Sequence, residues 1–191
     1  MLRSDNLYAL PAYLPVPVDD GACSHLAGLR VPSISLPATD GTFIDLSAAT
    51  AHSTVVYCYP RTGSPDAEPS GGVQAWNRIP GARGCTPQAL AFRDQWQHFR
   101  QLGVQVYGLS TQDVEYQREA VVRLHLPFSL LSDAELNLTR ALGLPTFTYA
   151  EWTLLIRVTL VIRAGMIVKV FYPVFPPDQN AVTVLSWFRT E

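Results

Sequence analysis

The sequence predicts an α/β fold in which helices flank a central mixed sheet. Two observations support this prediction. Short β-branched and aromatic runs alternate with longer segments whose apolar residues recur every three or four positions. Two further pairs of short strands are separated by turn residues, as in β-hairpins. A length of 191 residues suits one ordinary domain. We therefore expect a single mixed sheet that contains all of the predicted strands.

The first 30 residues form a separate segment. They are rich in proline, which fixes φ and lacks a backbone donor, so helix and central strand are both disfavoured. We therefore predict an extended, mobile arm at residues 1–30 and a domain at residues 31–191.

The first strands of the domain follow directly. An Asp40-Gly41 pair supplies residues that tolerate a positive φ, which predicts a hairpin around it. The next apolar run contains Cys58 and ends at Pro60, as expected for a strand buried on both faces. The predicted strands are residues 31–36, 42–46 and 53–59.

A long loop and a helix come next. Residues 60–84 hold four prolines and five glycines, too many for regular structure. The helix that follows has Thr86 as its expected N-cap and Pro87 at its first position. Its apolar stripe, which Cys85 extends by one turn, consists of Ala89, Phe92, Trp96 and Phe99.

The remaining elements alternate in the α/β manner. We expect strands at 104–109 and 128–131, helices at 113–126 and 133–142, a hairpin of 154–162 with 166–172, and a last helix opening near Asn180.

Charge and hydropathy exclude several classes of partner. The 14 basic and 16 acidic residues give a net charge of −2, so there is no general electrostatic case for nucleic acid or an anionic membrane. No apolar segment is long enough to span a membrane, and the proline-broken first twenty residues do not make a signal peptide. We expect a cytoplasmic protein that binds small molecules or proteins.

The three cysteines, Cys23, Cys58 and Cys85, are too few for a disulfide scaffold, and neither they nor the four histidines show metal-ligand spacing. A thiol attacks as the thiolate, which the start of a helix and a nearby arginine both favour. Cys85 has both features in sequence, because Arg83 precedes it. It is therefore a candidate nucleophile, although a cysteine at this place also packs simply under a first helical turn.

Five ordered blocks resemble a known family. They are residues 55–60 (Val-Val-Tyr-Cys-Tyr-Pro), 84–94 (Gly-Cys-Thr-Pro-Gln, then Ala-Phe-Arg-Asp), 103–110 (Gly-Val, then Gly-Leu-Ser), 126–133 (Leu-Pro-Phe, then Leu-Leu-Ser-Asp) and 157–162 (Arg-Val-Thr-Leu-Val-Ile). Together they resemble the peroxiredoxins, most closely the bacterioferritin-comigratory (Q-type) branch.

This resemblance implies a thioredoxin-like fold and a thiol peroxidase without metal or organic cofactor. Cys85 would attack the peroxide, Arg157 would reach it from a neighbouring strand, and Gln88 would hydrogen-bond that arginine. Without the resemblance, the favoured interpretation of Arg157 is a strand arginine that extends to solvent or pairs with a surface carboxylate. The implied partners are a hydroperoxide and a small-thiol or thioredoxin-type reductant.

The sequence departs from the family pattern before the cysteine. Arg78 and Ala82 occupy the positions of the usual proline and threonine. One alternative assigns the hydroxyl role to Thr62, with the loop at 61–84 as an insertion. The other treats residues 80–82 as a shortened loop end.

A second departure concerns turnover. Leu90 stands where Q-type members often have a resolving cysteine. Cys58 is expected in the core, and Cys23 would reach Cys85 only if the arm folded over the site or came from a second subunit. We therefore expect a one-cysteine mechanism with an external thiol.

Other interpretations stay open from sequence. These are a thiol–disulfide oxidoreductase on the same fold and a low-turnover redox sensor or binding module. The low charge fraction suits subunit contacts, which leaves a homodimer as an open alternative. An apolar wall for a peroxide pocket is a further hypothesis, with Trp76, Phe171, Tyr172 and Phe175 as its candidates.

Overall fold

A computed structural model describes residues 3–48 and 52–191. Its centre is a five-stranded sheet with the strand order β5-β4-β3-β8-β9. The strands are β3 (Thr54–Cys58), β4 (Gln105–Ser110), β5 (Leu130–Ser132), β8 (Val158–Arg163) and β9 (Met166–Phe171). β3, β4 and β5 run parallel, whereas β8 is antiparallel to both β3 and β9. The predicted central mixed sheet is thus confirmed. The prediction that a single sheet contains every strand is wrong, because two strand pairs form separate two-stranded sheets.

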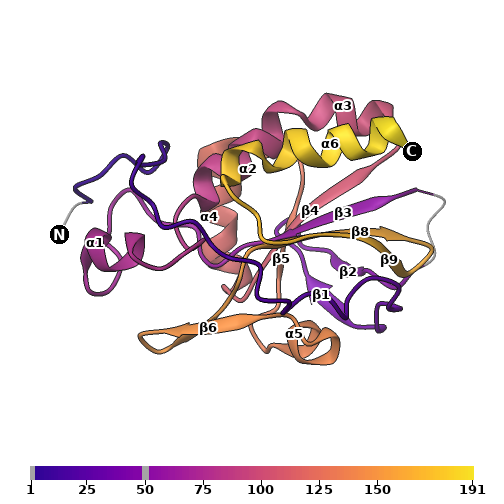
Figure 1. Cartoon of the computed structure of the whole chain (residues 1–191), viewed down its shortest axis with the longest axis horizontal. Coiled ribbons are helices and arrows are strands. Elements are labelled where there is room, and N and C mark those ends of the chain that lie inside the picture. The colour runs from indigo at the N-terminus through magenta and orange to yellow at the C-terminus, as the bar shows by residue number, and fades with distance from the viewer. Residues whose placement is uncertain (1–2, 49–51) are drawn as a thin grey trace.

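Helices cover the two faces of the sheet unequally (Figure 1). Along β3, Val55 and Tyr57 point into one apolar cluster, and Val56 and Cys58 point into the other. The first cluster is closed by α2 (Cys85–Asp94), α3 (Trp96–Gln101), α4 (Val114–Leu124) and α6 (Asn180–Thr190). The second is closed by α5 (Asn137–Leu142) together with the N-terminal hairpin and part of the arm.

Side-chain caps fix the starts of two helices. The Asp113 carboxylate accepts the Tyr116 amide at 2.7 Å, which starts α4 as predicted. The Asp133 carboxylate accepts the amides of Leu138 and Thr139, so α5 begins four residues later than its predicted start at 133.

The N-terminal hairpin of β1 (Ser35–Pro37) and β2 (Phe43–Asp45) is present with shorter strands than predicted. Asp40 accepts the Thr42 amide at 3.0 Å, and Gly41 has a φ of 88°. The Asp-Gly pair therefore makes the turn that its chemistry predicts.

The predicted single strand at 154–162 is wrong. It is divided into β7 (Trp152–Leu155) and β8, and β7 pairs with β6 (Thr146–Tyr149) in a hairpin that the sequence analysis missed. At the break the Ile156 amide donates to the Pro145 carbonyl at 2.8 Å. Arg157 consequently lies between two strands rather than within one.

Two other predictions for residues 60–99 need correction. The loop at 61–84 contains α1 (Gly72–Asn77), and the helix carrying the apolar stripe breaks at Gln95 into α2 and α3. Trp76 of α1 is buried against Ala82 and Leu154, so tertiary packing orders a helix that its glycines would disfavour in isolation.

The arm is not mobile at Cys23, contrary to the prediction. Cys23 and Leu26 are buried in the second apolar cluster, and the Gly28 amide donates to the Ile167 carbonyl of β9. Residues 1 and 2 of the predicted arm lie outside the described residues, and the division into an arm and a domain stays a prediction.

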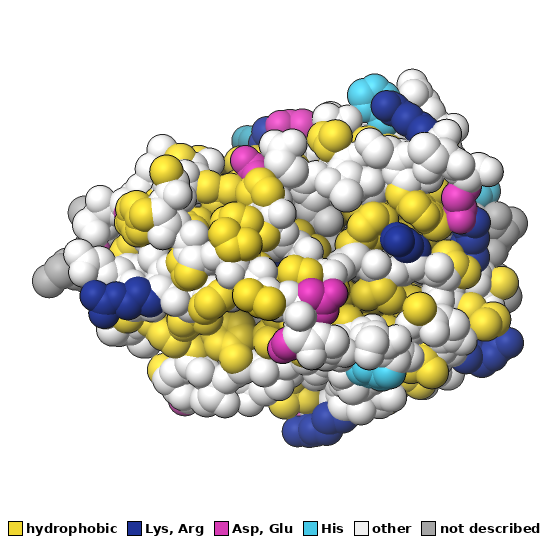
Figure 2. All heavy atoms as spheres, viewed as in Figure 1, with side chains coloured by type: hydrophobic (Ala, Val, Ile, Leu, Met, Phe, Trp, Pro, Cys, Tyr) yellow, Lys and Arg dark blue, Asp and Glu magenta, His cyan; other side chains and the backbone are white. Residues whose placement is uncertain are grey.

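The surface in the same view is largely apolar and uncharged, with few scattered charged side chains (Figure 2). This agrees with a chain in which charged residues make up 16%. Among the described helices, none has the length and apolar character needed to cross a membrane.

Candidate active site

Cys85 is the first residue of α2, as the sequence predicted, and its side chain is 5% exposed. The residue before the helix is Gly84, whose φ of 108° is a backbone conformation that favours glycine. Thr86 is therefore not the N-cap, which corrects that prediction. The backbone amides of Cys85 and Thr86 have no acceptor within the helix, and they add partial positive charge beside the thiol.

Arg157 supplies a full positive charge at the same place. Its Nη2 lies 3.2 Å from the Cys85 sulfur, and the side chain is 2% exposed. The guanidinium also donates from Nε to the Gly81 carbonyl at 3.2 Å and from Nη2 to the Ala82 carbonyl at 3.3 Å. These backbone acceptors hold the planar group against the sulfur.

Gln88 fixes the other side of the guanidinium. Its Oε1 accepts a hydrogen bond from Arg157 Nη1, and its Nε2 donates to Asn180 Oδ1 at 2.9 Å. The same Asn180 oxygen accepts the Thr159 hydroxyl at 2.7 Å. The structure thus joins Cys85, Arg157 and Gln88, three of the predicted site residues, and adds Asn180 behind them.

Thr62 lies near this group but is engaged elsewhere. Its hydroxyl donates to Gln112 Oε1 at 3.0 Å, and its amide donates to the same oxygen at 2.8 Å. The threonine is 1% exposed and borders a pocket that also touches Ala82. Its hydroxyl retains lone pairs and can still accept a hydrogen bond there, so the role assigned to Thr62 stays a prediction.

Thr86 presents a second hydroxyl to the same pocket. It is 1% exposed, and its Oγ1 has no hydrogen-bond partner among the described residues. A buried hydroxyl without a partner is costly and favours a site that a ligand completes.

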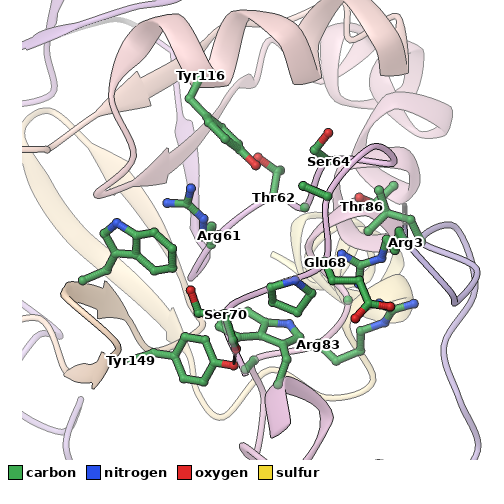
Figure 3. A pocket seen from close by; sticks show the side chains of 18 residues that line it. Arg3, Arg61, Thr62, Ser64, Glu68, Ser70, Arg83, Thr86, Tyr116 and Tyr149 are labelled. Carbon is green, nitrogen blue, oxygen red and sulfur yellow. Dashed lines mark hydrogen bonds between the residues drawn. The ribbon is translucent and has the colours of Figure 1, made fainter. Parts of the chain in front are cut away.

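The pocket beside the first turn of α2 has a volume of about 400 Å³ (Figure 3). Trp76, Tyr149 and Trp152 form much of its wall, with the rings of Trp76 and Tyr149 5.0 Å apart. Phe171, Tyr172 and Phe175 line a different pocket beside η1 (Pro177–Gln179). The predicted apolar wall is therefore wrong for these three residues, and Trp76 is the one member of that predicted set that lines the pocket beside α2.

The side chain of Arg83 binds the arm, although the sequence suggested that it would favour the Cys85 thiolate. Its guanidinium forms an ion pair with Asp5 at 2.5 Å and donates to the carbonyls of Asn6 and Ala9, all in the arm. Arg83 thus ties the arm to the residues before α2, and Arg157 is the arginine in contact with the thiol.

Cys85 packs against a part of the core that carries no charge. Tyr57 and Tyr59 share its apolar cluster, and burial raises the pKa of both phenols well above their usual value. Neither ring carries a negative charge at neutral pH that would compete for Arg157.

The other two cysteines lie across the sheet. Cys58 and Cys23 belong to the second apolar cluster, whereas Cys85 belongs to the first. Burial, with the charges of Asp20 and Asp19, raises the pKa of Cys23 to about 12. The core position predicted for Cys58 is confirmed, and it is 0% exposed.

Within the described residues, no three His, Cys, Asp or Glu side chains are grouped so as to hold a metal ion.

Comparison with known proteins identifies the family. The model of the redoxin family matches residues 26–185. A chloroplastic peroxiredoxin Q of Populus jackii is 30% identical over 164 residues, covering 85% of this chain and 68% of that protein. This chain belongs to the peroxiredoxins of the redoxin family.

Other relatives of this peroxiredoxin agree. A chloroplastic peroxiredoxin Q of Oryza sativa subsp. japonica is 30% identical over 154 residues, which cover 80% of this chain and 62% of the rice protein. The solved bacterioferritin comigratory protein of Xanthomonas campestris superposes with a TM-score of 0.66 at 21% identity, covering 94% of this chain and 98% of that one. That likeness supports the thioredoxin-like fold.

Sequence reasoning missed two residues of this site. Asn180 was seen only as the start of the last helix, and Thr86 was interpreted as a cap. The sequence held a weak signal for each, because a polar residue at a helix start needs a partner. The packing of α6 against α2 supplies that partner for Asn180, whereas the Thr86 hydroxyl has none among the described residues.

Proposed function

We propose that this peroxiredoxin is a thiol peroxidase that reduces hydrogen peroxide or organic hydroperoxides through Cys85, with electrons from an external thiol. The observation that carries the proposal is the 3.2 Å contact between Arg157 Nη2 and the Cys85 sulfur, at the first turn of α2.

The first step oxidises the thiolate. The Cys85 sulfur attacks the terminal peroxide oxygen, an S–O bond forms and the O–O bond breaks. Sulfur loses two electrons and becomes a sulfenic acid. The leaving oxygen takes the electron pair and a proton, which gives water from hydrogen peroxide or an alcohol from an organic hydroperoxide.

Arg157 acts in this step as a fixed charge. Its hydrogen bonds to Gly81, Ala82 and Gln88 exist before the peroxide arrives, so little reorganisation accompanies the reaction. The guanidinium stabilises the thiolate and then the negative charge that spreads over both peroxide oxygens.

The second step regenerates the thiol. An external thiol attacks the sulfenic sulfur, water leaves, and a mixed disulfide forms, which a second thiol reduces. The sheet separates Cys85 from Cys23 and Cys58, which supports the one-cysteine mechanism. The reductant is a small thiol or a thioredoxin-type protein. The homodimer and the cytoplasmic location remain predictions.

The test is rapid mixing of the reduced protein with hydrogen peroxide in the presence of excess small-molecule thiol. We expect catalytic consumption by the natural protein and none above background by Cys85→Ser, with Cys58→Ser as the matched control that retains activity. Equal rates for natural protein and Cys85→Ser would overturn the assignment.

The same measurement separates the rival interpretations. A redox sensor would consume about one equivalent of peroxide and stop. A thiol–disulfide oxidoreductase would reduce insulin disulfides, for which the partner cysteine three residues away is missing from this sequence.

A further inference from the structure

The pocket beside Cys85 is larger than hydrogen peroxide requires. Its volume is about 400 Å³, whereas a water molecule takes up about 30 Å³ in the liquid. Its size lies within the range of sites that bind small organic molecules. The aromatic wall of Trp76, Tyr149 and Trp152 suits the apolar body of such a molecule.

Two aromatic rings hold Arg61 in the wall of this pocket. The Arg61 guanidinium lies 4.1 Å from the centre of the Trp152 ring and 4.6 Å from that of Tyr116. These cation–π contacts fix the position of the charge without using its N–H groups.

Arg61 has no anionic partner in the described part of the chain. No carboxylate there lies within ion-pair distance of it, and no group there accepts its hydrogen bonds. The other two arginines of the lining, Arg3 and Arg83, share the carboxylate of Asp5, and each forms an ion pair with it.

The one carboxylate of the lining is also occupied. Glu68 accepts hydrogen bonds from the amide and hydroxyl of Ser4. Figure 3 shows Glu68 beside Arg3 and Arg83 on one side of the pocket, and Arg61 beside Tyr116 on the other. The Arg61 side of the pocket therefore carries an unopposed positive charge.

The end of the pocket nearest to Cys85 lies at α2. Gly84 and Thr86, the neighbours of Cys85, line it together with Ala82, whose carbonyl lies 3.7 Å from the Cys85 sulfur. In Figure 3 Thr86 and Arg61 lie on opposite sides of the cavity. A molecule that fills the cavity can thus present one end to the thiol region and the other to Arg61.

We propose that this pocket selects an organic hydroperoxide that carries a carboxylate, and that Arg61 is the specificity-determining residue that binds the carboxylate. This inference rests on the proposed thiol peroxidase function. A guanidinium matches a carboxylate with two parallel hydrogen bonds, and the aromatic rings hold the group in the required orientation.

The test compares two peroxides that differ in one group. Cumene hydroperoxide and its para-carboxylate derivative are mixed rapidly with the reduced protein, and the rate constant of Cys85 oxidation is measured. For the natural protein we expect the carboxylate to react about tenfold faster or more, as charge-assisted hydrogen bonds imply. Arg61→Gln should abolish this preference and leave the hydrogen peroxide rate within about twofold.

Two variants act as controls. Arg78→Gln makes the same charge change at an exposed residue outside the pocket and should keep the full preference. Arg61→Lys keeps the positive charge but lacks the planar guanidinium, so it should retain only part of the preference for the carboxylate peroxide. In the natural protein the preference should also decline as salt is raised from about 0.05 to 0.5 M, a result that depends on no variant.

Three outcomes would overturn the inference: no preference in the natural protein, an equal loss for both peroxides in Arg61→Gln, or the same loss in Arg78→Gln. The inference would also be overturned if the two peroxides reacted equally fast but anionic thiols reduced the sulfenic acid faster than neutral thiols. That result would assign the pocket to the reductant. If hydrogen peroxide itself fails to oxidise Cys85, the proposed function fails instead.

Discussion

At the scale of single residues, the site depends on hydrogen bonds that hold one buried arginine in a fixed position. Arg157 is 2% exposed, so water does not screen its charge. The free-energy cost of burying that charge therefore depends on the groups that contact it. The backbone carbonyls of Gly81, Ala82 and Arg83 supply three of them, and Gln88 supplies a fourth. Asn180 in turn determines which way the Gln88 amide faces, because its Oδ1 accepts the Gln88 Nε2 hydrogen bond. Asn180 is thus a positioning residue that acts through Gln88.

Asn180→Ala should weaken both the fold and the reaction. The substitution leaves the Gln88 amide and the Thr159 hydroxyl without their acceptor, which costs about 1–3 kcal/mol of unfolding free energy. Displacement of Arg157 should lower the rate constant with hydrogen peroxide about 10- to 100-fold. Denaturant unfolding and rapid mixing measure the two effects.

Thr183→Ala on the exposed side of the same helix is the matched control and should change neither value. A purely structural Asn180 would lower stability while leaving the rate constant and its pH profile unchanged. That result would remove Asn180 from the site.

At the scale of elements, the start of α2 depends on Gly84. Its φ of 108° is strained for any residue with a Cβ, and a Cβ there would lie 2.8 Å from both Leu10 Cδ2 and Pro177 Cγ. The arm and η1 therefore close on this glycine from two sides. Their packing holds the turn that places Cys85 at the helix start.

Gly84→Ala should destabilise the protein and slow peroxide reduction. The backbone conformation alone costs about 1–2 kcal/mol, and the clash adds about 1–3 kcal/mol. Gly28→Ala is a matched control, since its φ of 83° brings the same backbone penalty with no atom within 4 Å. Thermal unfolding should rank Gly84→Ala below Gly28→Ala, and only the former should lose activity. Equal losses in both variants would contradict this account.

The β1–β2 hairpin has its own dependence on pH. Hydrogen bonds from Ser33 and Ser47 hold the pKa of Asp45 below its usual value. Because the folded pKa is the lower one, this stabilisation is present above about pH 4 and is lost as the pH falls through the folded pKa.

Asp45→Asn should therefore lower the Tm at pH 7 and have little effect at about pH 2.5. The side chain is only partly buried and still in contact with solvent, so the difference at pH 7 should be under about 1 kcal/mol. Calorimetry of both proteins at the two pH values measures the gap. A gap of the same size at both values would show that ionisation of Asp45 does not matter.

At the scale of the whole molecule, the sheet separates the thiols into two compartments. Alternation along β3 sends Tyr57 towards Cys85 and Cys58 away from it, and the arm brings Cys23 to the Cys58 side. A disulfide between Cys85 and Cys58 would require the sheet to open, and one between Cys85 and Cys23 would require the arm to leave its apolar cluster.

Oxidation should therefore stop at the sulfenic acid when no external thiol is present. After one equivalent of hydrogen peroxide, mass spectrometry of the trapped protein should find sulfenic acid at Cys85 and reduced Cys23 and Cys58. Cys23→Ser should give the same result, since burial keeps the Cys23 thiol protonated. A peptide that joins Cys85 to Cys23 would contradict the one-cysteine mechanism.

Local chemistry made much of this structure predictable. The Asp40-Gly41 turn, the start of a helix at Asp113 and the buried strand around Cys58 follow from interactions within a few residues, and they occur where the sequence places them. The errors arose where distant segments decide the local conformation. The break before Arg157 depends on the β6–β7 pairing, and α1 depends on the burial of Trp76.

By itself, the sequence determined the α/β class, the place of Cys85 at a helix start and the family, because periodicity and ordered motifs are local properties of the chain. The resemblance to the family implied that Arg157 reaches the thiol. Tertiary structure alone decided that Asn180 supports this arginine and that Arg61 lines a pocket with no ion-pair partner among the described residues. The physical reason is that a charge acquires its function from the groups packed around it, and those groups come from segments far apart in the chain.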